Sequence, residues 1–232
     1  MQQLTDDIVH VWEVDLNVDP AFLKTCSRTL SPDELERANK YAFEKDHNYF
    51  IARRGVLRKL IGHYLNAKPD SIYFNYGPFG KPYLPKYHDF QFNLAHSNGH
   101  ALMAFSIKIP LGIDLEFINR NLEFDNIADH FFSRGETKSL KNVSTEQKAI
   151  SFYNCWTRKE AFIKARGDGL TFPLDKFEVS IEPNDQKALI GLYHDSENAG
   201  DWTIKSLEVE GDFAAALAFK DKNISVNSNV WE

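Results

Sequence analysis

The sequence predicts the same order of elements twice along the chain, and this repetition restricts the possible folds more than any other feature. Shifting the chain by 102 positions without gaps pairs identical residues: Ser31 with Ser133, Glu34 with Glu136, Glu44 with Glu146, Phe50 with Phe152, and Ile61 with Ile163. These identities are few and weak evidence by themselves. The order of the predicted elements is the stronger evidence.

Each half begins with a stretch rich in apolar and β-branched residues, which predicts a strand. Each such strand leads to a helix start that resembles a capping box, at Ser31 or at Ser133. The elements predicted in the two halves are strands at 8–16 and 101–117, long helices near 46–65 and 146–166, and closing strands at 71–76 and 176–181. We therefore predict an α+β fold of two similar halves, residues 1–105 and 106–232, related by a pseudo-twofold axis with a cleft between them.

The composition is that of a folded, soluble protein, since 43% of the 232 residues are hydrophobic and 26% are charged. The longest apolar runs, such as 214–219, are far shorter than the roughly 20 residues that a membrane helix needs, so we expect a cytoplasmic protein without membrane association. A net charge of −6 argues against broad binding to nucleic acid, which rests on basic surfaces. Cys26 and Cys155 are too isolated to predict a zinc site or a disulfide.

The run Gly112-Ile113-Asp114-Leu115-Glu116 alternates acidic with apolar side chains. Alternate residues of a strand face the same side, so Asp114 and Glu116 would present two carboxylates together. A hard cation such as Mg²⁺ relieves the repulsion between them, and magnesium sites commonly combine a few carboxylates with substrate phosphates. The alternative is an acidic, solvated strand face, and the motif alone does not decide between the two.

Residues 152–164 predict a helix on which Trp156, Glu160 and Lys164 recur every four positions and share one face. Glu160 would supply a third metal ligand or accept a proton, and Lys164 would neutralise charge on a phosphate. The alternative for this helix is a surface salt bridge beside a core tryptophan.

The run 92–100 predicts the end of a strand followed by a turn at Asn98-Gly99. Such a turn can direct backbone N–H groups and the imidazole of His96 at a phosphate, although a single histidine in a turn is more often structural. Just upstream, 77–82 predicts a tight loop that carries Lys81.

Basic residues gather in the first half in two clusters. Arg37 and Lys40 lie one helical turn apart, and Arg53, Arg54 and Arg58 follow on the next predicted helix. Both clusters suit phosphate binding, because arginine offers a bidentate fork and lysine a compact charge. A solvated helix face is the default alternative for each cluster.

With these motifs in this order, the sequence resembles the 4′-phosphopantetheinyl transferase superfamily, in particular its larger, internally duplicated, Sfp-type group. The Gly-Ile-Asp-x-Glu run is joined by Trp-x-x-Lys-Glu-x-x-x-Lys about 40 residues later, behind an Asn-x-x-His-Ser turn. The residues that carry the resemblance are the runs 79–82, 92–97, 112–116 and 156–164.

The resemblance implies an enzyme that moves the phosphopantetheine arm of coenzyme A, its co-substrate, to a serine of an apo acyl or peptidyl carrier protein. It implies coenzyme A in the cleft, with its nucleotide on the side of 1–105 and the metal and catalytic helix in 106–232. It implies these roles: Asp114, Glu116 and Glu160 as ligands of Mg²⁺ or Mn²⁺, Glu160 as the base, Lys164 and His96 at the diphosphate, Lys81 and Arg53 at the nucleotide, and Arg37 and Lys40 near the 3′-phosphate. The segment Phe131-Phe132-Ser133 with Glu136 resembles the approach to the carrier-docking region.

Three positions depart from the pattern of the family. Ala95 stands where many relatives have a serine, Glu34 stands where a lysine can help to bind the 3′-phosphate, and Tyr49-Phe50 replaces a more polar pair. These departures concern nucleotide recognition rather than the reaction.

Two other functions are alternatives: a metal-dependent hydrolase of nucleotide diphosphates, and a binding module that has lost turnover. The resemblance does not identify the carrier protein or its pathway. Because one chain supplies both sides of the cleft, a monomer is expected.

Overall fold

The computed structural model describes residues 3–167, 169–183, 185, 189–192, 198–221 and 223–231, and it has the mixed α and β content that the sequence predicts. The first half contains, in order, β1 (Ile8–Asp15), α1 (Pro20–Ser27), α2 (Pro32–Ala38), α3 (Glu44–Leu65), the 3₁₀ turn η1 (Pro69–Ser71), β2 (Asn75–Tyr76), β3 (Pro82–Tyr83), β4 (Phe90–Ser97) and β5 (His100–Ile107). The second half contains β6 (Leu111–Phe117), α4 (Phe124–Phe131), α5 (Arg134–Asn142), α6 (Thr145–Arg166), η2 (Gly169–Thr171), η3 (Leu174–Lys176), β7 (Phe177–Val179), β8 (Leu189–Leu192), η4 (Ala199–Asp201), β9 (Trp202–Ser206), β10 (Phe213–Lys220) and β11 (Ser225–Val230).

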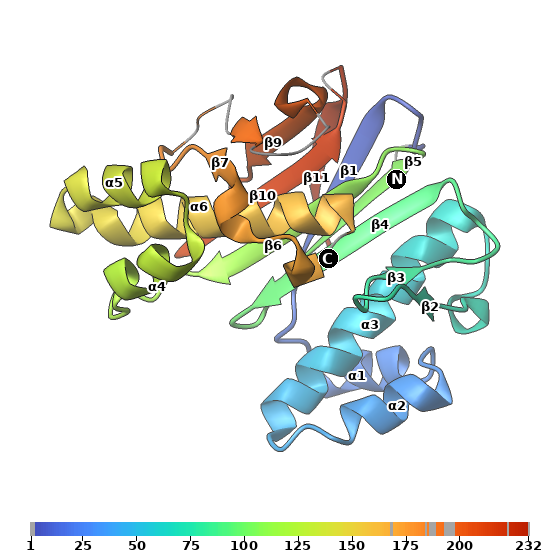
Figure 1. Cartoon of the computed structure of the whole chain (residues 1–232). Coiled ribbons are helices and arrows are strands. Elements are labelled where there is room, and N and C mark those ends of the chain that lie inside the picture. Colours follow the sequence, from blue (N-terminus) through green and yellow to red (C-terminus); the bar gives the residue numbers. More distant parts are fainter. Residues whose placement is uncertain are drawn as a thin grey trace.

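Two main sheets form the centre of the molecule (Figure 1). One has the strand order β11-β1-β5-β4 and the other has the order β6-β10-β9. β11 runs parallel to β1, with Ile8 opposite Ser225, so the last strand of the chain completes the sheet that the first half begins. Where the sheets meet, β4 lies beside β6, and the side chain of Asn93 accepts a hydrogen bond from the backbone N–H of Ile113 at 2.9 Å.

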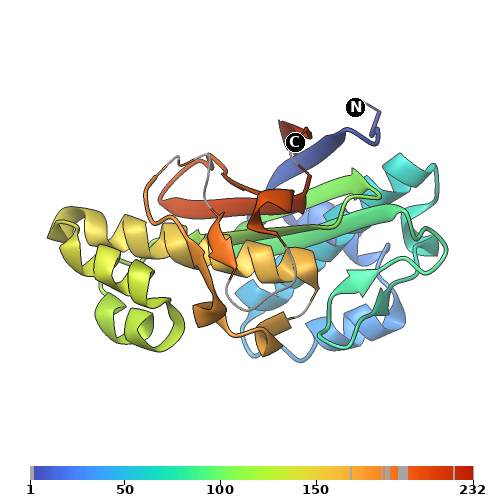
Figure 2. The ribbon, with the colours of Figure 1, turned by 45° about the horizontal axis from the view of Figure 1, so that its top comes forward.

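The long helices cover one side of this strand layer (Figure 2). α6 packs on β6 and β10, while α3 packs on the first sheet through a shared apolar cluster and is covered in turn by α1. A third cluster joins the two sheets through residues of β1, β5, β6 and β10. The two sheets are therefore packed together through a shared apolar cluster.

α3 and α6 have the same length of 22 residues and end in the same way. Their C-caps, Asn66 and Gly167, are both in the left-handed conformation that commonly terminates a helix. The positions of these two helices in the chain confirm the long helices that the sequence predicts. The pseudo-twofold relation between the halves, with a division at residues 105 and 106, stays a prediction.

The capping boxes predicted at Ser31 and Ser133 are both present, and each glutamate has a second set of partners. The carboxylate of Glu34 accepts a hydrogen bond from the backbone N–H of Ser31. It also accepts hydrogen bonds from the Nε–H groups of Arg54 and Arg58, each at 2.7 Å. Glu136 bonds the N–H of Ser133 and also pairs with Lys159 at 2.7 Å. In both halves a buried glutamate thus anchors a short helix to the long helix behind it.

The structure corrects two predicted strands. The stretch 101–117 is two strands, because Lys108 adopts a φ of +62° and Pro110 has no N–H to continue a ladder. In the stretch 71–76, Ser71 ends η1, residues 72–74 pair with no described strand, and only Asn75–Tyr76 pairs with β3. Cys26 and Cys155 are free, buried thiols. Among the residues described, no helix is both long enough and apolar enough to cross a bilayer.

Candidate active site

A cavity of about 470 Å³ opens at the seam between the halves. Its side chains come from both halves and include nearly all of the residues that the motifs single out. Those from the first half are Arg37, Phe50, Arg53, Arg54, Tyr76, Ala95 and His96, and those from the second half are Asp114, Glu116, Trp156, Glu160 and Lys164. The structure therefore brings together three motifs that lie far apart in the sequence.

β6 and α6 form the wall from the second half. Asp114 is 4% exposed, and its Oδ1 atom accepts a hydrogen bond from the ammonium of Lys164 at 2.6 Å. Glu116 is half-buried two residues further along the strand, and Glu160 lies one helical turn before Lys164. Lys164 thus forms an ion pair with Asp114 of β6. This differs from the alternative, a surface salt bridge between residues of the same helix.

The carboxylates of this wall perturb one another. Burial raises the pKa of Asp114, although the ammonium of Lys164 opposes the shift. Burial and then the negative charge of Asp114 raise the pKa of Glu116 to about 7. The same two causes raise the pKa of Glu160. Burial lowers the pKa of Lys164, but the three carboxylates together outweigh burial and raise it. Because three carboxylates share this wall with one ammonium, the wall carries a net negative charge, which disfavours full ionisation of the carboxylates.

The donor set of this wall fits a hard divalent cation. Asp114 Oδ2 is buried and has no hydrogen-bond partner within the part of the chain that is described, so it is an acceptor without a donor. Oxygen donors of this type are those that Mg²⁺ and Mn²⁺ prefer. Among the described residues no three His, Cys, Asp or Glu side chains stand as a ready-made metal site, and Lys164 holds one oxygen of Asp114.

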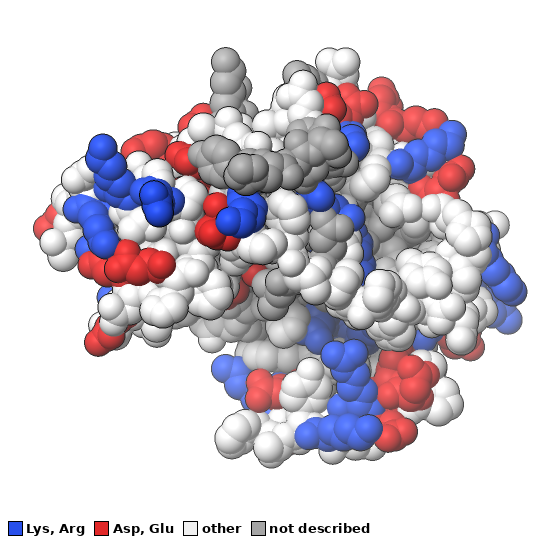
Figure 3. Space-filling model, in the orientation of Figure 1, with Lys and Arg blue, Asp and Glu red and all other residues white. Residues whose placement is uncertain are grey.

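The wall from the first half is cationic. Arg53 and Arg54 lie on α3, are each 6% exposed and line the cavity, and the exposed Arg37 lies at its edge on α2. Figure 3 shows basic side chains on the lower lobe and in the hollow above it. The ring of Phe50 lies 5.6 Å from the Arg37 guanidinium and 5.5 Å from that of Arg53, so both cations contact the same aromatic ring. The default alternative of a solvated helix face is wrong for the α3 cluster, because all three of its arginines are buried.

His96 lies at the end of β4, just before the predicted turn. Asn98 and Gly99 adopt φ values of +43° and +86°, so this turn needs left-handed backbone, which Asn and Gly tolerate best. His96 is an exposed residue that lines the cavity. Partial burial by the cavity walls, and then the charges of Arg53 and Lys164, lower its pKa to about 4. The imidazole is therefore neutral at neutral pH and can donate one hydrogen bond to a phosphate oxygen.

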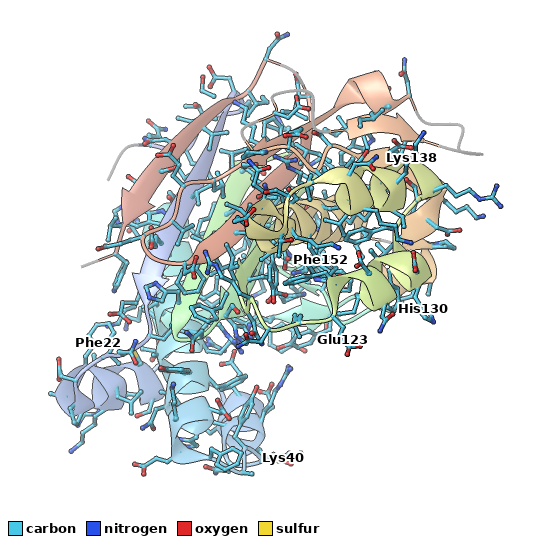
Figure 4. The ribbon with its side chains drawn as sticks, turned by 90° about the vertical axis from the view of Figure 1, so that its left-hand side faces the viewer. Phe22, Lys40, Glu123, His130, Lys138 and Phe152 are labelled. Atoms are coloured by element: carbon cyan, nitrogen blue, oxygen red, sulfur yellow. The ribbon has the colours of Figure 1, made fainter. Side chains whose placement is uncertain are left out.

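Two predicted site residues do not line this cavity. Lys40 is exposed, pairs with Glu36 at 2.8 Å, and lies at the far end of the lobe formed by α1–α3 (Figure 4). The ammonium of Lys81 donates instead to the carbonyl oxygens of Leu111 and Lys164. Their roles at the nucleotide stay predictions.

The departures at Glu34 and at Tyr49-Phe50 also have structural consequences. Glu34 is buried beneath the cationic wall, where it orients Arg54 and Arg58, so it does not compete for a phosphate. Arg58 is 1% exposed and donates to the carbonyls of Pro69 and Ile72, which makes it a structural residue. Phe50 supports the guanidinium groups rather than hydrogen-bonding a ligand.

Two residues at the site, Arg54 and Ser97, were not assigned individual roles from the sequence. Arg54 lines the cavity and donates to the hydroxyl of Tyr76 at 3.0 Å, and Ser97 donates to Glu116 at 3.4 Å while it accepts from the N–H of Phe117. Arg54 neighbours Arg53 in the sequence, and Ser97 follows His96, so adjacency to a motif was the only available signal.

An α+β cleft with a cationic wall facing clustered carboxylates defines an enzyme that acts on a phosphorylated substrate. Residues 110–218 match the family model described as the 4′-phosphopantetheinyl transferase superfamily, and residues 18–108 match the one described as 4′-phosphopantetheinyl transferase, N-terminal.

Individual relatives agree with these matches. The chain is 34% identical to the 4′-phosphopantetheinyl transferase HetI of Nostoc sp., over 93% of this chain and 89% of that protein. It is 31% identical to the 4′-phosphopantetheinyl transferase Sfp of Bacillus subtilis, over 69% and 70% of the two chains. It is 30% identical to the L-aminoadipate-semialdehyde dehydrogenase-phosphopantetheinyl transferase of Mus musculus, over 88% and 71%. The chain therefore belongs to the 4′-phosphopantetheinyl transferase superfamily, which confirms the resemblance.

Proposed function

We propose that this protein transfers the 4′-phosphopantetheine arm of coenzyme A to a serine hydroxyl of an apo acyl or peptidyl carrier protein and releases 3′,5′-ADP. The observation that carries the proposal is the opposition of Arg53 and Arg54 to Asp114, Glu116 and Glu160 across one cavity. Coenzyme A has a diphosphate and a separate 3′-phosphate, so a single cavity must neutralise negative charge at two places. The acidic wall would do so at the diphosphate through a bound cation, and the arginines of the other wall would do so at the nucleotide.

The wall from the second half would hold the metal. Asp114, Glu116 and Glu160 are the ligands that we propose for Mg²⁺, with Mn²⁺ as an alternative, because their shared negative charge and the unpartnered Asp114 Oδ2 fit a hard cation. When bound, such an ion supplies charge neutralisation at the diphosphate.

The protein's own side chains would carry out the remaining steps. Glu160, whose pKa is raised, would accept the proton of the carrier serine. The serine oxygen then forms a bond to the β-phosphorus as the bond to 3′,5′-ADP breaks. Lys164 and the neutral His96 would donate hydrogen bonds to phosphate oxygens as charge develops on them.

The wall from the first half would hold the nucleotide. Arg53 would bind it directly, and Arg37 at the edge of the cavity would contact the 3′-phosphate. On this assignment residues 1–105 bind the nucleotide and residues 106–232 carry the metal and the catalytic helix.

The carrier protein would approach the face next to α4. Phe131 is 46% exposed there, and it makes an edge contact with Trp156 of the cavity wall at 5.8 Å. Figure 4 shows this side of the molecule, where the buried Phe152 of α6 packs against Phe124 of α4 at 5.1 Å. We further propose that the protein acts in the cytoplasm as a monomer, since a single chain supplies both walls.

Mass spectrometry of apo carrier proteins incubated with coenzyme A and Mg²⁺ tests the proposal. The carrier should gain one phosphopantetheine, and 3′,5′-ADP should appear in equal amount. Cleaved coenzyme A with an unmodified carrier would indicate the hydrolase, and intact coenzyme A with every carrier of a broad panel would indicate a binding module. The family matches favour neither of these alternatives.

A further inference from the structure

Lys81 lies on a closed turn between β2 and β3. The N–H of Gly77 donates to the carbonyl of Lys81 at 2.9 Å, and the N–H of Gly80 donates to the carbonyl of Gly77 at 2.9 Å. Gly80 and Pro82 line the main cavity, whereas Lys81 between them does not. Lys81 lines a smaller cavity behind the wall, which it shares with Pro110 and Ala165. The residues on either side of Lys81 therefore line the main cavity, while Lys81 itself lines the smaller cavity.

The half-buried ammonium of Lys81 joins two elements of the second half. It donates to the carbonyl oxygen of Lys164 at 2.6 Å and to that of Leu111 at 3.0 Å. Leu111 is the first residue of β6, and Lys164 belongs to the last turn of α6. One side chain from the first half thus links the start of the acidic strand to the end of the catalytic helix.

The carbonyl of Lys164 is one that needs an outside partner. The last four carbonyl groups of a helix have no donor within the helix, and a cation near that end also interacts favourably with the helix dipole. α6 ends at Arg166, so the Lys164 carbonyl is among these groups. Lys81 supplies the missing donor.

β6 and α6 are in close backbone contact at this same place. A Cβ atom added to Gly112 would lie 2.2 Å from the carbonyl oxygen of Ala161 and 2.3 Å from the nitrogen of Ala165. This approach allows the side chain of Lys164 to reach Asp114 at 2.6 Å. The distance between strand and helix therefore sets the position of a proposed catalytic group, and Lys81 bonds the backbone on both sides of that contact.

We propose that Lys81 is a positioning residue that fixes the end of α6 against β6 and so places the ammonium of Lys164, rather than a residue whose side chain binds the nucleotide. The proposal rests on the transferase function proposed above. In the absence of the Lys81 ammonium, the last turn of α6 would loosen and Lys164 would lose its fixed position beside Asp114. The binding of the nucleotide at the first-half wall would change little.

The variants Lys81→Met and Lys81→Arg separate these two roles, with Lys86→Met as the control for an exposed lysine near the same hairpin. Lys81→Met should lower kcat by about 10- to 100-fold, the usual effect of losing hydrogen bonds to a charged group, while KM for coenzyme A stays within about twofold. Lys81→Arg should recover most of kcat, because a guanidinium has donors for both carbonyls. Lys86→Met should behave as the unsubstituted protein.

Hydrogen exchange of the amides at 164–167, measured without coenzyme A, provides a readout that does not depend on activity. Exchange should be at least about tenfold faster in Lys81→Met and unchanged in Lys81→Arg and Lys86→Met, because opening of the last turn exposes these amides. An increase in KM with kcat and exchange unchanged would show that Lys81 binds the nucleotide and would overturn the proposal. A loss of kcat without faster exchange would also overturn it. If the unsubstituted protein modifies no carrier, the proposed function fails, but the exchange measurement still decides the role of Lys81.

Discussion

The wall built from α3 and β4 and the wall built from α6 and β6 use elements of the same kind, yet they carry opposite charge. The first presents Arg53, Arg54 and the neutral His96, and the second presents carboxylates with Lys164 among them. The difference begins behind the walls, at the two capping-box glutamates. In the first half, Glu34 pairs with Arg54, which continues into the cavity.

In the second half, Glu136 pairs with Lys159, which is fully buried and bonds the carbonyls of Leu174 and Phe177. The cavity face of α6 is then left to Glu160 and Lys164. In both halves a buried glutamate pairs with a cation of the long helix, yet one cavity wall is cationic and the other is acidic. The comparison teaches that this buried pair does not fix the charge of the wall, because the glutamate lies in the core and not in the cavity. Five predictions test it, from the largest expected effect to the smallest.

Removal of the buried cation should cost the second half most of its stability. Lys159→Met leaves the carboxylate of Glu136 in the core without its cation, and we expect a loss of about 3–5 kcal/mol in the free energy of unfolding. Urea denaturation measures this loss. Lys141→Met, which breaks an exposed pair with Asp129, should cost no more than about 1 kcal/mol. Equal losses for the two variants would show that the buried Lys159–Glu136 pair contributes no more to stability than an exposed ion pair.

Removal of one charge from the acidic wall should abolish most of the activity without unfolding the protein. Asp114→Asn keeps the shape of the side chain but removes the charge that holds Lys164 and, as proposed, the metal. We expect kcat to fall at least about 100-fold, more than the usual effect of losing a residue that only supports a ligand. The rate of carrier modification at saturating Mg²⁺ checks this, with the exposed Glu210→Gln as the control. A wild-type rate for Asp114→Asn would contradict the assignment of the acidic wall.

Removal of one charge from the cationic wall should affect binding rather than turnover. Arg53→Met should raise KM for coenzyme A about 10- to 100-fold, the usual worth of a charged hydrogen bond, with kcat nearly unchanged. Steady-state kinetics over a range of coenzyme A concentrations separate the two constants. Lys40→Met, at an exposed pair outside the cavity, should change KM less than about threefold. A similar increase for both variants would place Lys40 at the nucleotide after all.

His96 should show a small pH effect with a defined sign. Its pKa is lowered to about 4 in the folded protein against 6.5 for an ordinary histidine, so the unfolded chain binds more protons between these values. His96 therefore does not reduce the free energy of unfolding above about pH 6.5, and it reduces that free energy progressively as the pH falls toward 4. The melting temperature of His96→Gln should fall less steeply over this window than that of the unsubstituted protein. An equally steep fall would show that His96 titrates normally.

Bound coenzyme A should raise the pKa of His96, because phosphate anions favour the imidazolium. An NMR titration of the imidazole with and without coenzyme A measures this shift directly. No shift would place the diphosphate away from His96.

The sequence by itself determined the elements that depend on local patterns. The capping boxes at Ser31 and Ser133, the long helix that carries Glu160 and Lys164, and the Asn98-Gly99 turn all follow from short-range periodicity or backbone preference. The same local patterns misled where a tertiary constraint dominated. The apolar stretch 101–117 reads as one strand although Pro110 divides it, and 71–76 reads as a strand although only Asn75–Tyr76 pairs with a neighbour.

The family resemblance named most of the residues that line the cleft, but only the tertiary structure decided which of them face it. Lys81 and Lys40 are as basic as Arg53, yet one bonds carbonyls at the seam and the other lies in solvent. Glu34 and Glu160 are the same residue type, yet one anchors arginines in the core and the other lines the cavity. The physical reason is that charge is a property of a residue, whereas burial, partners and direction depend on chain segments that are distant in the sequence.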